Sequence, residues 1–126
     1  KMVDLSKSGM NVYYEDGKPK SIITYVSSNV LKEEDYFRTG QLEYIEEYDK
    51  KCEHYIQRKF YNINGKPTST LELVDSRKLI YTNKEYYDNG TLKEEGQMVF
   101  NEVMGDYQKN GKWKFVLDTG NDGLEK

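Results

Sequence analysis

The sequence of 126 residues contains no alanine, and it has only two prolines, one cysteine, one histidine and one tryptophan. Because alanine is the residue that most favours the helix, its absence argues against helices. A lone cysteine, Cys52, cannot form an internal disulfide. The chain also lacks any apolar run near the roughly 18 residues of a membrane-spanning helix. These absences indicate a chain of strands and turns without disulfide cross-links.

Neither sign of charge dominates the sequence. It holds 19 basic and 22 acidic residues, interspersed along the chain, for a net charge of −3. Without a basic stripe, nucleic-acid binding has no electrostatic basis. The net acidity also disfavours a lipid surface, because anionic membranes attract clusters of Lys and Arg. No signal peptide is recognisable, and two compartments stay open: the cytoplasm, or export with the signal peptide removed.

Tyrosine, in contrast, is abundant, with 12 copies in the chain. Tyrosine favours strands, where its ring half-buries on a pleated surface. The hydrophobic content of 36% is below the roughly 45–50% of an average globular domain. We therefore expect a thin protein with little deep core, stabilised by cross-strand pairs and aromatic packing.

A short motif recurs along the chain: aromatic residues, a turn with glycine, and a departing strand. Asn-Gly between such runs is a strong hairpin signal, because both residues accept φ > 0. The glycines of the successive copies are spaced by 23, 25, 25 and 30 residues, a period typical of repeat architectures. The five copies cover residues 13–19, 36–42, 60–67, 85–95 and 115–120, with Gly17, Gly40, Gly65, Gly90 and Gly120.

The motifs and turns predict short strands nearly throughout. The expected strands are 10–14, 20–26, 30–37, 41–48, 53–61, 68–74, 79–87, 92–100, 103–107 and 112–117, after an irregular lead-in over residues 1–9. Asn29 suits either a turn or the cap of a one-turn helix over 30–34. A further Asn-Gly turn is expected over 108–111, which makes Gly111 a structural turn glycine with Gly17, Gly40, Gly65 and Gly90.

Hairpins with short turns produce an antiparallel meander, because parallel neighbours need long crossovers. We therefore predict an all-β fold: one domain over residues 1–126, an elongated antiparallel meander of about five hairpin repeats, with little or no helix.

The pattern of two aromatics, glycine and a charged strand, best developed in residues 85–95 and 105–115, resembles the MORN-repeat variant of bacterial antitoxin-like proteins of the YwqK type. The resemblance covers roughly residues 12–126 and is strongest after residue 83. It implies an elongated hairpin-repeat sheet that serves protein contacts and, in some members, lipid contacts. It also implies an association with antitoxins.

Catalytic chemistry has little support in the sequence. Cys52 and His54 would share one face of a strand, but two ligands do not make a metal site. Adjacent carboxylates such as Glu46 and Glu47 point to opposite faces of a strand. No phosphate-binding glycine loop is present. We expect no catalytic residue, no metal and no cofactor, and hence not an enzyme.

The aromatic rows are either packing elements or a binding surface. The candidate binding residues are Trp113, Tyr86, Tyr36, Tyr13 and Phe115, with Trp113 as the preferred anchor. We expect a non-enzymatic scaffold that binds a protein partner, or itself, through an aromatic row or an open sheet edge at residues 10–14. The alternative is an exported cell-surface module whose aromatics stack on cell-wall glycan, or more weakly a lipid-associated one. One tryptophan against 12 tyrosines favours the scaffold, because choline-binding wall repeats carry tryptophan in nearly every copy.

Overall fold

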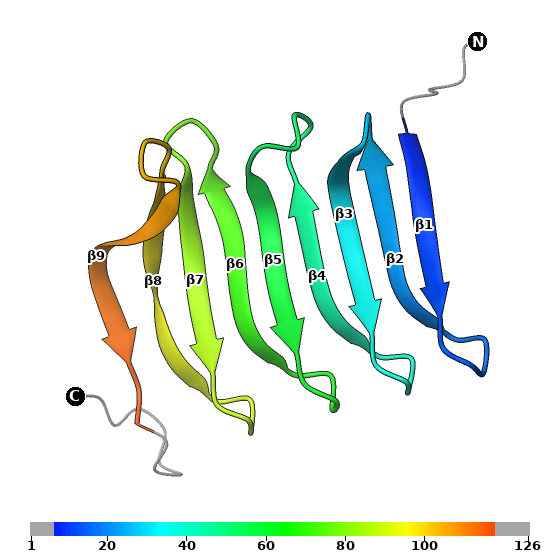
Figure 1. Cartoon of the computed structure of the whole chain (residues 1–126). Coiled ribbons are helices and arrows are strands. Elements are labelled where there is room, and N and C mark those ends of the chain that lie inside the picture. Colours follow the sequence, from blue (N-terminus) through cyan, green and yellow to red (C-terminus); the bar gives the residue numbers. More distant parts are fainter. Residues whose placement is uncertain (1–6, 118–126) are drawn as a thin grey trace.

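The computed structural model describes residues 7–117, which form one antiparallel sheet of nine strands. Each strand pairs only with its neighbours in sequence, so the sheet is an open meander (Figure 1). The strands are β1 (Lys7–Tyr13), β2 (Pro19–Val26), β3 (Asn29–Tyr36), β4 (Leu42–Tyr48), β5 (Tyr55–Tyr61), β6 (Pro67–Asp75), β7 (Ile80–Tyr86), β8 (Leu92–Asn101) and β9 (Asp106–Phe115). The predicted all-β meander is confirmed.

No residue of the described range is helical. The alternative of a one-turn helix over 30–34 is therefore wrong, and these residues belong to β3. The same range holds no helix long and apolar enough to cross a membrane. β1 begins at Lys7, so residues 7–9 are strand and not irregular lead-in. The expected fifth glycine, Gly120, lies outside the described residues.

Four hairpin turns at one end of the sheet share a single geometry (Figure 1, lower end). In the last of them, the Gly90 N–H donates to the Tyr87 carbonyl over 2.9 Å, and the Tyr87 N–H donates to the Thr91 carbonyl over 2.8 Å. The same two hydrogen bonds close the turns that contain Gly17, Gly40 and Gly65. All four glycines have φ between 85° and 94°. This is a three-residue loop, a type I turn followed by a left-handed residue.

This loop corrects the expected turn chemistry. Asn89 does not have a positive φ, because the three-residue loop requires one only at Gly90. The Asn89 Oδ1 instead accepts the Thr91 N–H over 2.9 Å. Two consecutive positive φ values occur at Ser27 (49°) and Ser28 (72°), which join β2 to β3 in a two-residue turn.

A β-bulge follows each of the four glycine turns at an equivalent position. After the first turn, Tyr13 pairs with Pro19 and Val12 with Ser21, which leaves Lys20 as the extra residue. The other extra residues, read from the same register shift, are Glu43, Thr68 and Lys93. Because turn and bulge recur together, each copy of the repeat presents the same positions to the same face.

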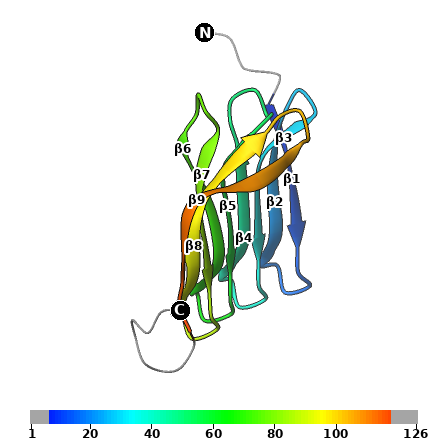
Figure 2. The same ribbon diagram turned by 90° about the vertical axis from the view of Figure 1, so that its left-hand side faces the viewer.

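The two faces of the sheet differ. We call the face that carries Tyr81 the covered face, because the upper part of the β8–β9 hairpin turns over it, away from the direction of the other strands (Figure 2). The ring centroids of Tyr81 and Tyr107 are 5.2 Å apart, and those of Phe100 and Tyr107 are 4.9 Å apart. Tyr81 is fully buried and donates its hydroxyl to the Tyr55 carbonyl over 2.6 Å.

The other side of the sheet is the open face, over which residues 7–117 place no second layer. Buried apolar side chains are few in the described chain: Ile45, Leu71, Tyr81 and Val116. Most of the sheet is thus a single layer, as the low hydrophobic content predicted.

The β8–β9 hairpin differs from the sequence prediction. The chain reverses over residues 102–105, where the Gly105 N–H donates to the Asn101 carbonyl and Asn101 Oδ1 accepts the N–H groups of Val103 and Met104. The expected strand over 103–107 is therefore largely this turn. The expected turn at Asn110-Gly111 is absent, because Gly111 lies inside β9.

The positive φ of Ser28 predicts that Ser28→Gly stabilises the protein by about 0.5–1 kcal/mol, because glycine adopts this conformation without a steric penalty. The matched control is Asn89→Gly. It removes the hydrogen bond to Thr91 and adds freedom to the unfolded chain, so it should cost about 1 kcal/mol. Urea denaturation of both variants checks the pair. A stabilising Asn89→Gly would contradict the three-residue loop.

Candidate functional site

A row of four equivalent tyrosines crosses the open face beside the glycine turns. Tyr13, Tyr36, Tyr61 and Tyr86 are the last residues of β1, β3, β5 and β7, and they pair with Pro19, Leu42, Pro67 and Leu92. Tyr86 follows Tyr81 by five positions in one strand, so alternation places it on the opposite face. We call these four residues the tyrosine row. Its members recur on every second strand, about 9–10 Å apart.

The tyrosine row is accessible to solvent. Tyr13 is 56% exposed, and the other three are half-buried. Burial, together with the charge and hydrogen bond of Glu34, raises the pKa of Tyr36. The hydroxyls of Tyr13, Tyr61 and Tyr86 hydrogen-bond to no group among residues 7–117. The row therefore combines aromatic surface with unused hydroxyl groups.

Two tyrosines that directly follow row members form hydrogen bonds within the protein. The hydroxyl of Tyr14 donates to the Tyr36 carbonyl over 2.6 Å, and that of Tyr87 donates to the Val116 carbonyl over 2.7 Å. Each bond joins one hairpin to the next along the sheet. Asn62 makes the equivalent link through its side-chain amide, which donates to the Asp88 carbonyl over 3.2 Å.

The structure aligns three of the predicted binding residues on one face of the sheet: Tyr13, Tyr36 and Tyr86. It adds Tyr61, which sequence analysis did not select because that copy was aligned on Phe60 with one extra residue. A simpler signal identifies it. Every row tyrosine stands four positions before its turn glycine, and Tyr61 has this spacing to Gly65.

Trp113 and Phe115 lie on the covered face, so they do not form one row with Tyr86. The Trp113 ring lies directly on the backbone of Gly96, where an added Cβ would be 2.2 Å from it. Lys109 Nζ lies 4.5 Å from the centroid of the Trp113 ring and 5.5 Å from that of Phe115. Trp113 Nε1 is buried with no hydrogen-bond partner in the described chain. Trp113 is therefore part of the bend in the last hairpin.

Two features of β9 make this packing possible. Gln97 pairs with Asn110 and Glu95 with Lys114, so residues 111–113 stand opposite Gly96 alone. The absence of a side chain at Gly96 leaves room for the indole. Gly111, with φ 71°, bends β9 at this irregularity.

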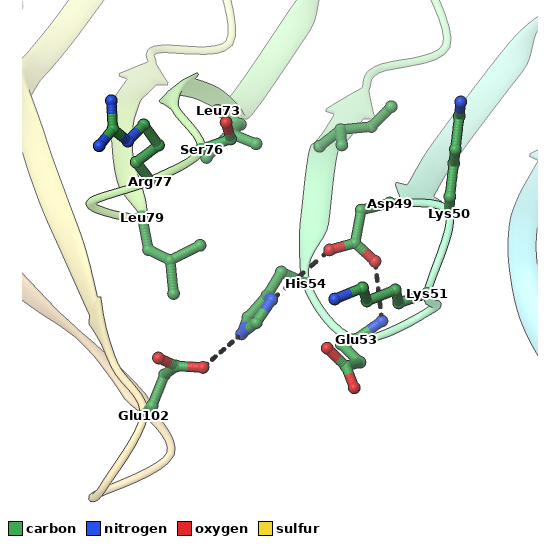
Figure 3. Close-up of a pocket in the computed structure, with 11 residues that line it drawn as sticks. Asp49, Lys50, Lys51, Glu53, His54, Leu73, Ser76, Arg77, Leu79 and Glu102 are labelled. Atoms are coloured by element: carbon green, nitrogen blue, oxygen red, sulfur yellow. Dashed lines mark hydrogen bonds and ion pairs between the residues drawn. The ribbon is translucent and has the colours of Figure 1, made fainter.

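A cavity of about 610 Å³ lies near the tips of β4–β5, β6–β7 and β8–β9 (Figure 3). Three of its lining residues contact one another: His54 Nδ1 is 3.5 Å from Asp49 Oδ2, and His54 Nε2 is 3.2 Å from Glu102 Oε2. Burial alone would raise the pKa of Asp49. The backbone N–H groups of Glu53 and His54, with the His54 side chain, outweigh burial and lower it. The contact joins the loop after β4 to the tip of the last hairpin.

The Cys52–His54 pair does not have the expected geometry. Both residues lie in the loop before β5, and Cys52 has φ 58°, so they are not strand neighbours on one face. Among residues 7–117 no group of three or more His, Cys, Asp or Glu side chains could hold a metal ion.

Three carboxylates gather on the covered face of β3 and β4. Glu33 pairs across the strands with Glu46, and Asp35 accepts the Ser21 hydroxyl over 2.7 Å. Burial first, then a hydrogen bond with Asp35 and the charges of Asp35 and Glu46, raise the pKa of Glu33 from 4.5 to about 7. The protonated form of Glu33 therefore persists to a higher pH than that of an ordinary glutamate.

The fold and the tyrosine row define a β-hairpin repeat protein with one open face. Residues 10–27 and 82–99 match the model of the MORN repeat variant, a family of non-enzymatic repeats that generally bind proteins or membrane lipids. The two segments fall on the β1–β2 and β7–β8 hairpins, and the hairpins between them have the same turn and bulge. No curated protein matches the chain.

Gly96→Ala should destabilise the protein by about 2 kcal/mol or more, because the new methyl group displaces the Trp113 ring. The matched comparison is the same change in a Trp113→Ala background, where we expect a cost below about 1 kcal/mol. Chemical denaturation of the four proteins measures the coupling. Equal costs in the two backgrounds would mean that the indole does not lie on Gly96.

Glu33→Gln should stabilise the protein at pH 8 and reduce the pH dependence of its free energy of unfolding. The raised pKa means that folding favours protonated Glu33. The stability that this proton contributes is therefore complete below pH 4.5 and is lost as pH rises through about 7. The shift corresponds to about 3 kcal/mol before solvent screening, which reduces it to about 1–2 kcal/mol. Unfolding free energies at pH 5 and pH 8 test this. The prediction fails if the variant gains no more at pH 8 than at pH 5.

Proposed function

We propose that this chain is a non-enzymatic repeat scaffold that binds a protein partner through the tyrosine row. The observation that carries the proposal is the row itself: four equivalent tyrosines on one face, of which only Tyr36 hydrogen-bonds through its hydroxyl within residues 7–117. Tyr13, Tyr61 and Tyr86 leave their hydroxyls without partners among residues 7–117, whereas Tyr14, Tyr81 and Tyr87 donate to backbone carbonyls. Tyrosine supplies rigid anchor area at protein interfaces.

The rest of the open face supports the same choice of surface. Beside the row, charged side chains pair with one another: Lys59 Nζ lies 3.0 Å from Glu72 Oε2, and Lys84 Nζ lies 3.8 Å from Glu95 Oε2. These charges already have partners of opposite sign within the face. The row is therefore its apolar strip, and a partner gains most by covering that strip.

An antitoxin role is one case of this function, in which the partner is a toxin protein. The exported alternative uses the same rings on the sugars of a wall polymer, and lipid association would use them at a membrane surface. The sheet edge offers self-association as a second route. Residues 8–13 of β1 carry no charge and are exposed, and no strand of the described chain pairs with their outer edge.

The test compares the immobilised wild-type chain with a Tyr36→Ala/Tyr61→Ala variant. We expect proteins captured from an extract to bind the variant at least about tenfold more weakly. Truncation of an interface anchor to alanine typically removes about 2 kcal/mol or more of binding free energy. Phe60→Ala is the matched control: an aromatic on the same strand, 39% exposed, on the opposite face. Capture that survives the double variant would exclude the row.

Parallel measurements separate the other partners. Light scattering on the purified chain detects self-association through β1. Sedimentation with cell-wall polymer and with anionic vesicles detects the glycan and lipid alternatives. Row-dependent binding to either in place of protein would contradict the proposal.

A further inference from the structure

The tyrosine row has a fixed period, and we infer from it that the partner segment is a proline-rich chain in the polyproline II conformation. The inference rests on the proposed function and names the partner's chemistry. The segment lies across the strands, along the row, with an apolar residue, preferably proline, at every third position.

The period of the row is set by the sheet. Its tyrosines stand on β1, β3, β5 and β7, and two strand spacings amount to about 9.6 Å. A polyproline II helix advances about 9.3 Å in its three-residue turn. Over the three intervals from Tyr13 to Tyr86, the accumulated difference is about 1 Å, which flexible side chains absorb.

Other linear conformations match less well. Residues on one face of an extended strand repeat every ~6.7 Å, so most of them would miss the tyrosines. The nearest helical repeat, seven residues, spans about 10.5 Å and falls out of register by about 3 Å over the same three intervals. Of these conformations, only the polyproline II helix has an axial repeat that matches the spacing of all four tyrosines.

The surface of the row suits such a chain. Smaller side chains, Pro19, Leu42 and Pro67, stand between consecutive tyrosines, so the row alternates rings with lower apolar positions. Proline rings of the partner fit between the tyrosine rings. A polyproline II backbone makes no internal hydrogen bonds, so its carbonyls can accept the unused hydroxyls of Tyr61 and Tyr86.

Charge favours a narrow partner over a second sheet. The row follows one margin of the open face, and the ion pairs Lys59–Glu72 and Lys84–Glu95 lie beyond it. A second copy laid face to face would remove these charges from water, at a cost that their attraction does not repay. A single chain along the row leaves them solvated.

The direct test is a chemical-shift titration of the ¹⁵N-labelled chain with two 12-residue peptides of equal composition. One repeats Pro-Gln-Gln four times, and the other contains the same four prolines at irregular spacing. We expect the periodic peptide to shift resonances around the tyrosine row and to bind at least about tenfold more tightly. Equal affinities, or no shift at millimolar peptide, would overturn the inference.

Variants locate the contact. Tyr61→Ala removes a ring from the middle of the row and should lower the affinity for the periodic peptide at least about tenfold. Phe60→Ala, on the opposite face, should leave this affinity unchanged. Tyr61→Phe keeps the ring and removes the hydroxyl, and an intermediate loss is expected. Full affinity in Tyr61→Ala would refute binding along the row.

A selection from random 12-residue displayed peptides distinguishes this inference from the proposed function. Binding peptides are counter-selected on the Tyr36→Ala/Tyr61→Ala variant. Enrichment of proline at every third position supports the inference. Row-dependent peptides without that period would overturn it and leave protein binding through the row intact. If no row-dependent peptide is found, both fail.

Discussion

The left-handed glycine of each hairpin turn, with the bulge that follows it, is the constraint on which this sheet depends. Gly90 closes a three-residue loop, and Lys93 is the extra residue after it; the same pair of features recurs at three earlier turns. A slip of one residue would turn every side chain of a strand to the other face. Because turn and bulge repeat together, tyrosines distant in sequence stand in one row.

A single-layer sheet has little interior, and the last hairpin compensates for this in one place. With no side chain at Gly96, the Trp113 ring lies against the backbone, and β8 and β9 turn over the face that carries Tyr81. Tyr107 and Phe100 complete that cluster, and His54 joins it to the hairpin tip through Glu102. The hairpin thereby covers one face, and the tyrosine row stays on the other.

The candidate surface was only partly predictable, because residue type does not reveal which face a side chain occupies. Tyr13, Tyr36 and Tyr86 were found from their place before the turn glycines, and Tyr61 could have been found by counting four residues back from Gly65. Trp113 was selected for its size and uniqueness. Its face depends on the residues inserted opposite Gly96, and nothing local to Trp113 indicates that insertion.

The sequence by itself determined the repeat, the antiparallel meander and the positions of Gly17, Gly40, Gly65 and Gly90, because turn formation depends on local backbone preferences. Tertiary structure decided where the last hairpin reverses. Asn110-Gly111 has the better local turn signal, but Asn101 caps the loop at Gly105. The longer hairpin lets Tyr107 reach both Phe100 and Tyr81. There, burial of aromatic surface between segments distant in sequence outweighed the local turn preference. Short-range sequence patterns do not reveal such long-range contacts.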